Sequence, residues 1–291
     1  MALIWYCASG LIYFVGAGLI IAIVLFSPYF KFKGKIFFVY GFMIIAGTMI
    51  VLSAAPKPLW LYSIWMILAI SWIAVYSRPH AVKSKRTRAL QAALILTCCI
   101  GILTESPYYI SPKVSPNNYR ELYVIGDSVS AGLGGKRIES WPSIIGKQHN
   151  IDAINLAQAG ATVDKAVSQA QMVGDSNGVI VIEIGGNDIL ALNPTSPDKF
   201  ETELEHVLTI LARPGRTIVM FELPLMPLQN QYGKVQRKLA KKFNVALIPK
   251  RYFVNVLSSE GATTDLIHLS QIGQDAMAKM VWTHIGKCFA Q

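Results

Sequence analysis

Charged side chains are scarce in this chain, and their distribution is uneven. Asp, Glu, Lys and Arg make up 15% of its 291 residues, and hydrophobic residues make up 53%. A soluble protein usually has a charged share of about 25%. So low a share excludes an ordinary soluble enzyme and indicates segments that lie in lipid. Acids are nearly absent from the first part, where residues 1–106 hold nine Lys or Arg but a single acid, Glu105.

The net charge of +10 does not indicate a nucleic-acid-binding protein. Residues 1–106 carry +8, whereas residues 107–291, with 18 basic and 16 acidic residues, carry only +2. A nucleic-acid footprint would be a basic stripe on a folded domain. Here the basic residues separate apolar runs, where they report membrane orientation. We therefore expect no nucleic-acid partner, and the sequence identifies no protein partner.

Cysteine is also rare. The chain has four cysteines. Cys7, Cys98 and Cys99 lie in apolar stretches, and only Cys288 falls in the polar half. The polar half therefore cannot form an internal disulfide, and its stability must come from its own core. No cysteine pair has metal-site spacing, and the histidines are scattered. We expect neither a metal nor an organic cofactor.

Long uncharged runs occupy the first 106 residues. A membrane span needs about 20 apolar residues, and four uncharged runs approach or exceed this length: 2–29, 36–56, 58–77 and 89–104. We predict an all-α transmembrane region over residues 1–106, with spans at about 3–27, 36–55, 58–77 and 88–106. The fourth run is the shortest, and Glu105 at its end is expected at the interface.

The loops between these spans differ in charge. Loop one carries Lys31, Lys33 and Lys35, and loop two carries only Lys57. Loop three carries five basic residues: Arg78, Lys83, Lys85, Arg86 and Arg88. Basic loops stay in the cytoplasm, so four spans place everything after residue 106 outside it. The expected location is a bacterial inner membrane, with the second half on the periplasmic side and membrane lipids as neighbours.

The second half predicts an α/β domain over residues 119–291, after a Pro-, Ser- and Asn-rich linker at 107–118. Short β-branched runs alternate with amphipathic stretches. Strands are expected at 121–125, 151–156, 179–184, 217–222 and 245–248, and helices at 141–148, 163–172, 198–211, 234–243 and 270–285. The run at 179–184 is typical of a strand buried on both faces. This alternation predicts a parallel sheet in a flavodoxin-like three-layer α/β/α sandwich.

Polar clusters follow the predicted strands, where ligands bind in such folds. The first strand ends in Gly126-Asp127-Ser128, and the second leads to Gly160. The third ends in Gly185-Gly186-Asn187-Asp188, and Asp265-Leu266-Ile267-His268 precedes the last helix.

These four blocks, in this order, resemble the SGNH, or GDSL-type, hydrolase family. The resemblance covers residues 119–286 and is strongest to bacterial thioesterases, lysophospholipases and arylesterases, in which the blocks recur at similar spacings. It does not cover residues 1–106, so the chain resembles such a hydrolase fused to a multi-span membrane region. It departs from the family at Leu266 and Leu269, where Gly and Pro are frequent, which affects the rim near His268 and hence the substrate.

The chemistry of a triad can be argued from the residues themselves. A serine hydroxyl is a poor nucleophile until a base takes its proton, and an imidazole accepts and returns a proton near neutral pH. Ser128 is the expected nucleophile and His268 its base. Asp265 can reach the other ring nitrogen, fix the tautomer and stabilise the imidazolium.

The resemblance implies the remaining roles. It assigns the oxyanion hole to the backbone N–H groups of Ser128 and Gly160 and to the side-chain amide of Asn187. Gly160 also has a physical rationale, because a residue without a side chain lets the backbone approach the substrate closely. Three further residues are expected to support the site as loop organisers: Asp127, Gly186 and Asp188.

The leading hypothesis is a membrane-anchored serine esterase, thioesterase or lipase-like enzyme. It would cleave acyl or acetyl esters on envelope lipid or polysaccharide through an acyl-serine intermediate. One alternative is an O-acyltransferase that uses the same triad to move an acyl group to a glycan. Another is a non-catalytic membrane assembly factor, which the intact triad residues argue against.

Two weaker features leave alternatives open. Five basic residues share one face of the helix at 234–243, where they form either a solvated face or a contact for anionic lipid: Lys234, Arg237, Lys238, Lys241 and Lys242. The apolar loop 223–228 either packs, lines an acyl pocket or touches the bilayer.

Overall fold

The chain forms two compact units in the computed structural model, which describes residues 2–78, 84–133 and 138–289. The first unit comprises Met1–Tyr109 with Leu225–Asn230, and the second comprises Ile110–Pro224 with Gln231–Gln291. We call the first the membrane unit, after the expectation that its helices span a membrane, and the second the hydrolase unit, after the family that its sequence blocks resemble.

The membrane unit is entirely helical. Its helices are α1 (Ala2–Ala8), α2 (Leu11–Phe32), α3 (Ile36–Leu52), α4 (Leu59–Tyr76) and α5 (Lys85–Glu105), followed by a 3₁₀ turn, η2 (Ser106–Tyr109). Among the described residues, three helical segments are long and apolar enough to cross a membrane: Leu11–Phe32, Leu59–Tyr76 and Lys85–Tyr109. Helix α3 has 17 residues, so it is about 26 Å long and lies at the lower limit for a span.

Two predicted boundaries of the apolar helices are wrong. The first long helix begins at Leu11 instead of residue 3, because Gly10 adopts a left-handed conformation with φ 78° and separates α1 from α2. The second ends at Leu52 instead of residue 55, because Ser53 is already extended and Pro56 disfavours helix in the residue before it. The last helix, predicted to be the shortest, has 21 residues.

Small residues allow close packing of these helices. A side chain at Gly16 of α2 would meet the Ala46 carbonyl at 2.9 Å, and one at Gly101 of α5 would collide with Tyr13 and Trp65. Such close backbone approach is the usual means of packing helices in lipid. Large apolar side chains stay exposed on these helices, including Phe26, Ile44, Leu96 and Leu103, as the predicted contact with lipid requires.

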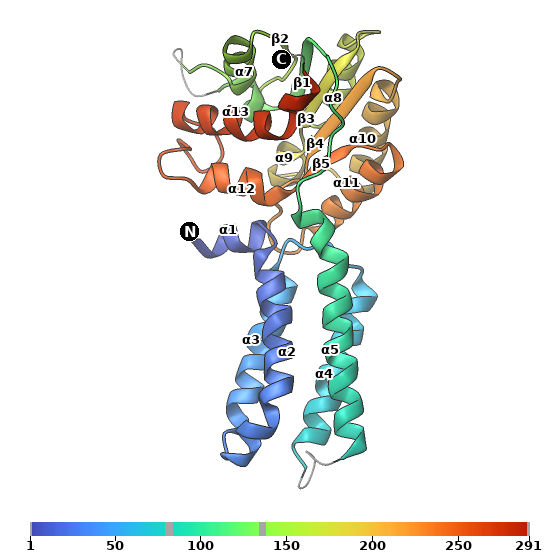
Figure 1. The fold of residues 1–291 in the computed structure, drawn as a ribbon, viewed down its shortest axis with the longest axis vertical. Helices are drawn as coiled ribbons and strands as arrows, with labels where there is room; N and C mark the ends of the chain where they lie inside the picture. Colours follow the sequence, from blue (N-terminus) through green and yellow to red (C-terminus); the bar gives the residue numbers. More distant parts are fainter. Residues whose placement is uncertain (1, 79–83, 134–137, 290–291) are drawn as a thin grey trace. The chain divides into compact units, whose positions relative to one another are not determined.

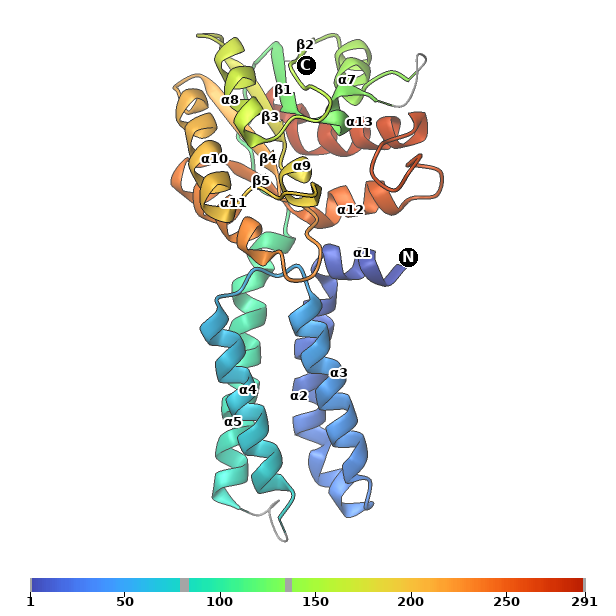
Figure 2. The same cartoon turned by 180° about the vertical axis from the view of Figure 1, so that it is seen from behind.

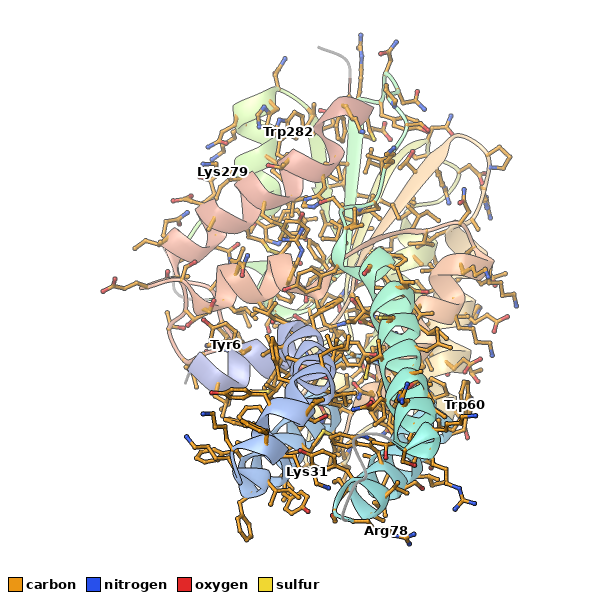
Figure 3. All side chains as sticks on the ribbon, turned by 60° about the horizontal axis from the view of Figure 1, so that its bottom comes forward. Tyr6, Lys31, Trp60, Arg78, Lys279 and Trp282 are labelled. Atoms are coloured by element: carbon orange, nitrogen blue, oxygen red, sulfur yellow. The ribbon has the colours of Figure 1, made fainter. Side chains whose placement is uncertain are left out.

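Charged groups lie at the ends of these helices. Lys31, in the last turn of α2, donates to the carbonyl of Arg78 (2.6 Å) and to that of Tyr76, so the end of α2 lies beside the end of α4 (Figure 3). Lys83 of loop three lies outside the described residues. Lys57 forms a buried ion pair with Glu105 at 2.9 Å, so the acid expected at the interface is paired inside the unit.

The hydrolase unit is built on a parallel five-stranded sheet. The strands are β1 (Glu121–Gly126), β2 (Asp152–Asn155), β3 (Gly178–Glu183), β4 (Arg216–Phe221) and β5 (Ala246–Ile248), in the order β2-β1-β3-β4-β5. This is the flavodoxin-like order, in which ligands bind beyond the carboxyl ends of β1 and β3. Strand β3 lies between β1 and β4 and all six of its residues are buried, as predicted for a strand covered on both faces.

Helices cover both faces of the sheet (Figures 1 and 2). One layer contains α7 (Trp141–His149), α12 (Lys250–Ser258) and α13 (Gln271–Ile285), and the other contains α8 (Val163–Met172), α10 (Pro197–Leu211) and α11 (Asn230–Lys242). The three-layer fold is confirmed. The sequence pattern did not predict α12 or two short helices at strand ends, α6 (Ser128–Ala131) and α9 (Gly186–Leu190).

The basic helix α11 lies differently from the prediction. Arg237 is not on an exposed basic face, because it is buried and bonds Glu222 at 2.7 Å. Lys238 and Lys242 form ion pairs with Glu201 and Glu205 of α10. Pairing with a neighbouring helix favours a solvated protein surface over a lipid contact.

The apolar loop after β4 divides between the two units. Its residues 225–230 belong to the membrane unit, where the Asn230 amide donates to the Ser53 carbonyl at 3.1 Å. Leu223 and Leu225 are buried, whereas Met226 and Leu228 are exposed.

Candidate active site

Ser128 lies directly beyond the carboxyl end of β1. It is the first residue of α6, it is 7% exposed, and Asp127 before it caps the helix by accepting from the Val129 N–H at 3.0 Å. Gly132, with φ 80°, ends the helix after one turn. The strand-to-helix turn therefore holds the Ser128 hydroxyl at the edge of the sheet where the other predicted site residues gather.

Two adjacent residues tie the loop of Gly160 to the end of β3. The Asn187 amide donates to the Ala161 carbonyl at 2.9 Å, and the Asp188 carboxylate accepts from the Val163 N–H at 2.9 Å. Asp188 also accepts from the Thr195 hydroxyl at 2.9 Å. These bonds place Gly160 beside Asn187, and they give Asp188 the loop-organising contacts expected of it.

Glycine is needed at Gly160 because of its backbone conformation. Gly160 has φ 71°, and a Cβ added there would have no atom within 4 Å, so its backbone conformation, rather than crowding, requires glycine. A Cβ on Gly186 would lie 3.4 Å from the Asp127 carboxylate, in ordinary van der Waals contact. The start of α9 thus lies against Asp127 without requiring glycine at Gly186.

The Asn187 amide group faces two acceptors. Its nitrogen lies 2.9 Å from the Ala161 carbonyl and 3.3 Å from Oδ2 of Asp127. Both amide hydrogens are therefore engaged, the second one weakly. An oxyanion would have to take the hydrogen that points to Asp127.

Asp265 and His268 form a hydrogen-bonded pair. The Nδ1 atom of His268 lies 2.6 Å from Oδ2 of Asp265, and Oδ1 accepts from the His268 and Ile267 N–H groups at 2.8 and 3.2 Å. Asp265 is exposed, yet its pKa is lowered to about 2, first because its side chain bonds the His268 ring and then because it bonds the His268 N–H. An ionised Asp265 leaves Nε2 of His268 as the ring atom available for proton transfer.

The predicted nucleophile, Ser128, and the predicted base, His268, have no hydrogen bond between them. Within the described residues, the Ser128 hydroxyl forms no hydrogen bond to His268. His268 is near enough for its charge to act on Asp127, the neighbour of Ser128. Catalytic hydrogen bonds are often long in ligand-free sites and tighten with substrate.

Leu266 and Leu269, the two residues near His268 that depart from the family pattern, differ in exposure. Leu266 has φ 79° and is 49% exposed, whereas Leu269 is fully buried. The prediction that both alter the rim is therefore wrong for Leu269, which is part of the core. Leu266 occupies a left-handed conformation that suits glycine.

Three groups behind the site were not predicted from the sequence. Glu183, the last residue of β3, is buried and accepts from the Ser130 hydroxyl at 2.8 Å. Gln169 pairs with both backbone groups of Gly126, at 2.9 and 3.1 Å. Gln274 accepts from the Trp141 N–H and donates to the Val129 carbonyl. The acid within the otherwise apolar run 179–184 was a signal that could have revealed Glu183.

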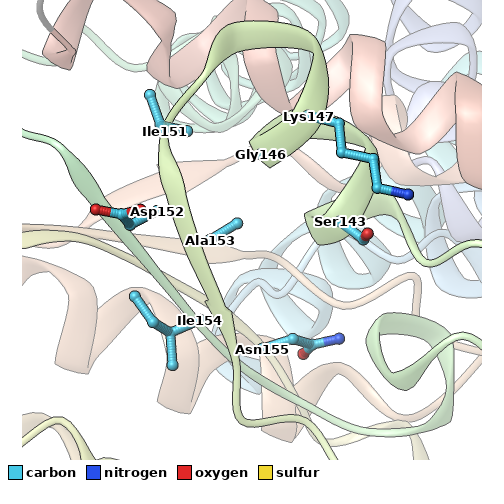
Figure 4. Close-up of a pocket in the computed structure, with 8 residues that line it drawn as sticks. All are labelled: Ser143, Gly146, Lys147, Ile151, Asp152, Ala153, Ile154 and Asn155. Carbon is cyan, nitrogen blue, oxygen red and sulfur yellow. The ribbon is translucent and has the colours of Figure 1, made fainter.

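No metal site is evident in the part of the chain that the structure describes, because no three His, Cys, Asp or Glu side chains gather there. A pocket of about 400 Å³ lies between α7 and β2 (Figure 4). It is lined by Ser143, Gly146, Lys147, Ile151, Asp152, Ala153, Ile154 and Asn155. None of the predicted site residues lines it.

Comparison with known proteins finds several hydrolases. The chain is 27% identical over 178 residues to an arylesterase of Vibrio mimicus, covering 55% of this chain and 86% of that protein. It is 24% identical over 203 residues to esterase TesA of Pseudomonas aeruginosa, covering 65% and 96%. It is also 24% identical over 173 residues to thioesterase 1/protease 1/lysophospholipase L1 of Escherichia coli K12, covering 55% and 82%.

Solved structures share the fold of the hydrolase unit. The psychrotrophic esterase EstA of a Pseudoalteromonas species matches with a TM-score of 0.51 at 17% identity, over 58% of this chain and 97% of that one. The family of GDSL-like lipases and acylhydrolases matches residues 124–276, which contain all four sequence blocks. Because this match spans more than half of the chain, the protein belongs to the GDSL-like lipase/acylhydrolase family and is a hydrolase of the esterase class.

Proposed function

We propose that the protein is a membrane-anchored serine esterase that acts through an acyl-Ser128 intermediate. His268 takes the proton of the Ser128 hydroxyl as its oxygen attacks the acyl carbonyl carbon. The tetrahedral intermediate collapses, and His268 returns the proton to the leaving alcohol or thiol. Water, deprotonated by the same imidazole, then releases the acid and restores Ser128.

One observation carries this proposal. The His268 ring is fixed by Asp265 at 2.6 Å, and His268 is near enough to act on Asp127, next to Ser128. A histidine held by a carboxylate through Nδ1 directs its second nitrogen to a nucleophile. A histidine with only a structural role would not require so short a hydrogen bond to a solvent-exposed carboxylate.

The oxyanion would lie among three donors. We assign these to the Ser128 and Gly160 N–H groups and the Asn187 amide, which the contacts of Asn187 and Asp188 bring together. Loss of one such donor typically reduces the rate by about 10²–10³-fold.

Ser128→Ala tests the nucleophile directly. The purified variant should lose hydrolysis of acyl esters and labelling by a fluorophosphonate probe, which reacts with activated serines. The exposed Ser168→Ala on α8 is the matched control and should keep both. Full esterase activity in Ser128→Ala would refute the mechanism, and absence of labelling in the wild type would favour the non-catalytic alternative.

The substrate is inferred from apolar side chains on the site loops. Four of them are large and exposed, at the end of α9, in the loop after it and in the loop before α13: Leu190, Leu192, Leu266 and Ile267. Exposed apolar side chains at a site favour an apolar ligand. We propose an ester or thioester with a long acyl chain, as on an envelope lipid, over an acetylated polysaccharide. A panel of acyl chain lengths tests this, and fastest turnover of acetyl esters would contradict it.

The same chemistry also allows transfer of the acyl group to a glycan. The acyl-serine can pass its group to a sugar hydroxyl in place of water. Incubation with an acyl ester and a glycan acceptor separates the two. Free acid supports hydrolysis, whereas acylated glycan supports transfer.

We also propose that the hydrolase unit lies outside the cytoplasm. The support is the basic charge of loops one and three, together with the bond of Lys31, at the end of α2, to the Arg78 carbonyl just after α4. A reporter fused after Gln291 that is active only outside the cytoplasm should be active. Activity of a cytoplasm-dependent reporter at that position would overturn the orientation.

A further inference from the structure

A buried pair of carboxyl groups lies directly behind Ser128. Asp127 is 3% exposed and Glu183 is 2% exposed, and Gly126, next to Asp127, is in register with Glu183 across β1 and β3. Each of the two carboxyl groups acts on the pKa of the other, so the two are close enough to interact. No lysine or arginine of the described residues forms an ion pair with either group.

Two interacting carboxylates, buried and without a cation, cannot both be ionised. Burial raises the pKa of both groups, and it raises the pKa of Glu183 well above its usual range. The charged groups that face the pair are Asp188 and His268, whose charges act on Asp127 with opposite sign. One proton must therefore be held between the two acids at neutral pH.

The contacts indicate which acid holds the proton. Asp127 accepts from the Val129 N–H at 3.0 Å and from the Asn187 amide at 3.3 Å, and donors such as these favour its ionised form. Glu183 accepts from the Ser130 hydroxyl at 2.8 Å, which in turn accepts from the Trp141 indole at 3.2 Å, and it also accepts from the Asp127 N–H. Each acid thus has two donors, but the charge of His268 acts on Asp127 and favours its ionised form, which leaves the proton on Glu183.

We propose that Glu183 is a protonated positioning residue that donates a hydrogen bond to Asp127 and thereby frees the Asn187 amide for the oxyanion. Asp127 and the oxyanion compete for the same amide hydrogen, because the other hydrogen is bonded to the Ala161 carbonyl. A proton from Glu183 partly neutralises Asp127 and weakens its hold on Asn187. This role rests on the proposed oxyanion hole, whereas the protonation itself does not.

Infrared spectroscopy tests the protonation without turnover. The wild type at pH 7 should show the carbonyl band of a buried protonated carboxyl group. Glu183→Gln should lose this band, and Asp127→Asn should keep it, because Glu183 can then donate to the new amide oxygen. A wild type without the band, or a band that disappears on Asp127→Asn, overturns the assignment.

Two substitutions at Glu183 test the role in catalysis. The Gln amide donates to Asp127 and accepts from Ser130 as the protonated acid does, so Glu183→Gln should keep kcat within about threefold, whereas Glu183→Met should lower kcat about 10–100-fold with little change in KM. Equal losses in both variants, or full activity of the Met variant, would contradict the role.

The pH dependence separates this role from a merely structural one. A raised pKa means that stability is lost as pH rises through it. The wild type should therefore lose kcat and Tm at alkaline pH, and Glu183→Gln should lack this loss, with a Tm advantage that grows from about pH 5 to pH 9. Parallel Tm curves for the two proteins would overturn the proposal even if Glu183→Met fails to fold.

Discussion

The side chain of Asp265 is exposed to solvent, but both of its carboxylate oxygens form hydrogen bonds. One oxygen accepts from two backbone N–H groups and the other bonds the ring of His268. The loop from Thr264 to His268 is closed by the Thr264 N–H, which donates to the His268 carbonyl at 2.9 Å. The same carboxylate thus shapes the loop and orients the imidazole.

Asp265→Asn should lower kcat by about 10²–10⁴-fold, because the amide cannot stabilise the imidazolium. The pKa of Asp265 is lowered to about 2 by its bonds to His268, so its contribution to stability is present above the pKa of an unfolded aspartate, about 4. The difference in Tm between wild type and Asp265→Asn should therefore shrink as pH falls from about 4 toward 2. A difference that stays constant over this range would contradict the assignment.

Leu266 keeps an apolar side chain in a strained backbone conformation, with φ 79° and 49% exposure. A left-handed conformation costs a non-glycine residue about 1–2 kcal/mol. Because the Leu266 side chain is exposed, its burial offsets little of this cost. Strain of this kind persists mainly at functional positions.

Leu266→Gly should therefore leave stability unchanged or raise it by about 1 kcal/mol, while activity on long-chain esters falls relative to short-chain esters. Ile267→Gly is the matched control, because Ile267 is 44% exposed and is not among the residues with positive φ. That control should lower Tm. Unchanged chain-length preference in Leu266→Gly would remove Leu266 from the acyl site.

At the scale of elements, the end of β1 is held by a single side chain of α8. Gln169 is fully buried and bonds the N–H and the carbonyl of Gly126. It thereby satisfies both backbone groups of the last residue of the strand, immediately before Asp127 and Ser128.

Gln169→Leu should lower the free energy of unfolding by about 1–3 kcal/mol, because it leaves the buried N–H of Gly126 unpaired, whereas the Gly126 carbonyl still accepts from the Gln158 N–H at 3.1 Å. Gln171→Leu, on the same helix but exposed, is the control and should change stability little. Chemical denaturation of both variants measures the difference. Equal stabilities would show that water replaces the amide at the end of β1.

At the scale of the whole molecule, the membrane unit contains a buried ion pair between Lys57 and Glu105. Thr104 accepts from the same ammonium group at 3.0 Å. Removal of one partner leaves an uncompensated charge that costs about 3–5 kcal/mol.

Lys57→Met and Glu105→Met should each lower Tm in detergent, and the double variant should recover most of the loss, because apolar side chains often replace a buried pair without cost. A thermal-shift assay on the three variants measures this. Additive losses in the double variant would show that each side chain acts through other contacts.

Much of the hydrolase unit followed from sequence periodicity. The strand positions at 121–125 and 179–184 agree with β1 and β3 within one residue. Short runs of β-branched residues between turn signals are typical of strands. The four polar blocks fall after strands or before the last helix, and the family match covers all of them.

The contacts among those blocks were decided by the tertiary structure. The sequence places Asn187 and Gly160 in separate loops, and only the packing of β1 beside β3 brings Asn187 to Ala161 and Asp127. The position of Arg237 was also decided by the tertiary structure. Helical spacing predicted that it lies on a basic face, whereas the fold buries it against Glu222.

By itself, the sequence determined the apolar character of the first 106 residues, the alternation of strands and helices, and the residue types of a serine hydrolase. These properties depend on local spacing and composition. The tertiary structure alone decided that Glu183 interacts with Asp127, that Gln169 closes β1 and that Leu266 is strained and exposed. Such contacts join residues distant in the chain or depend on one backbone angle, and neither is encoded in a local pattern.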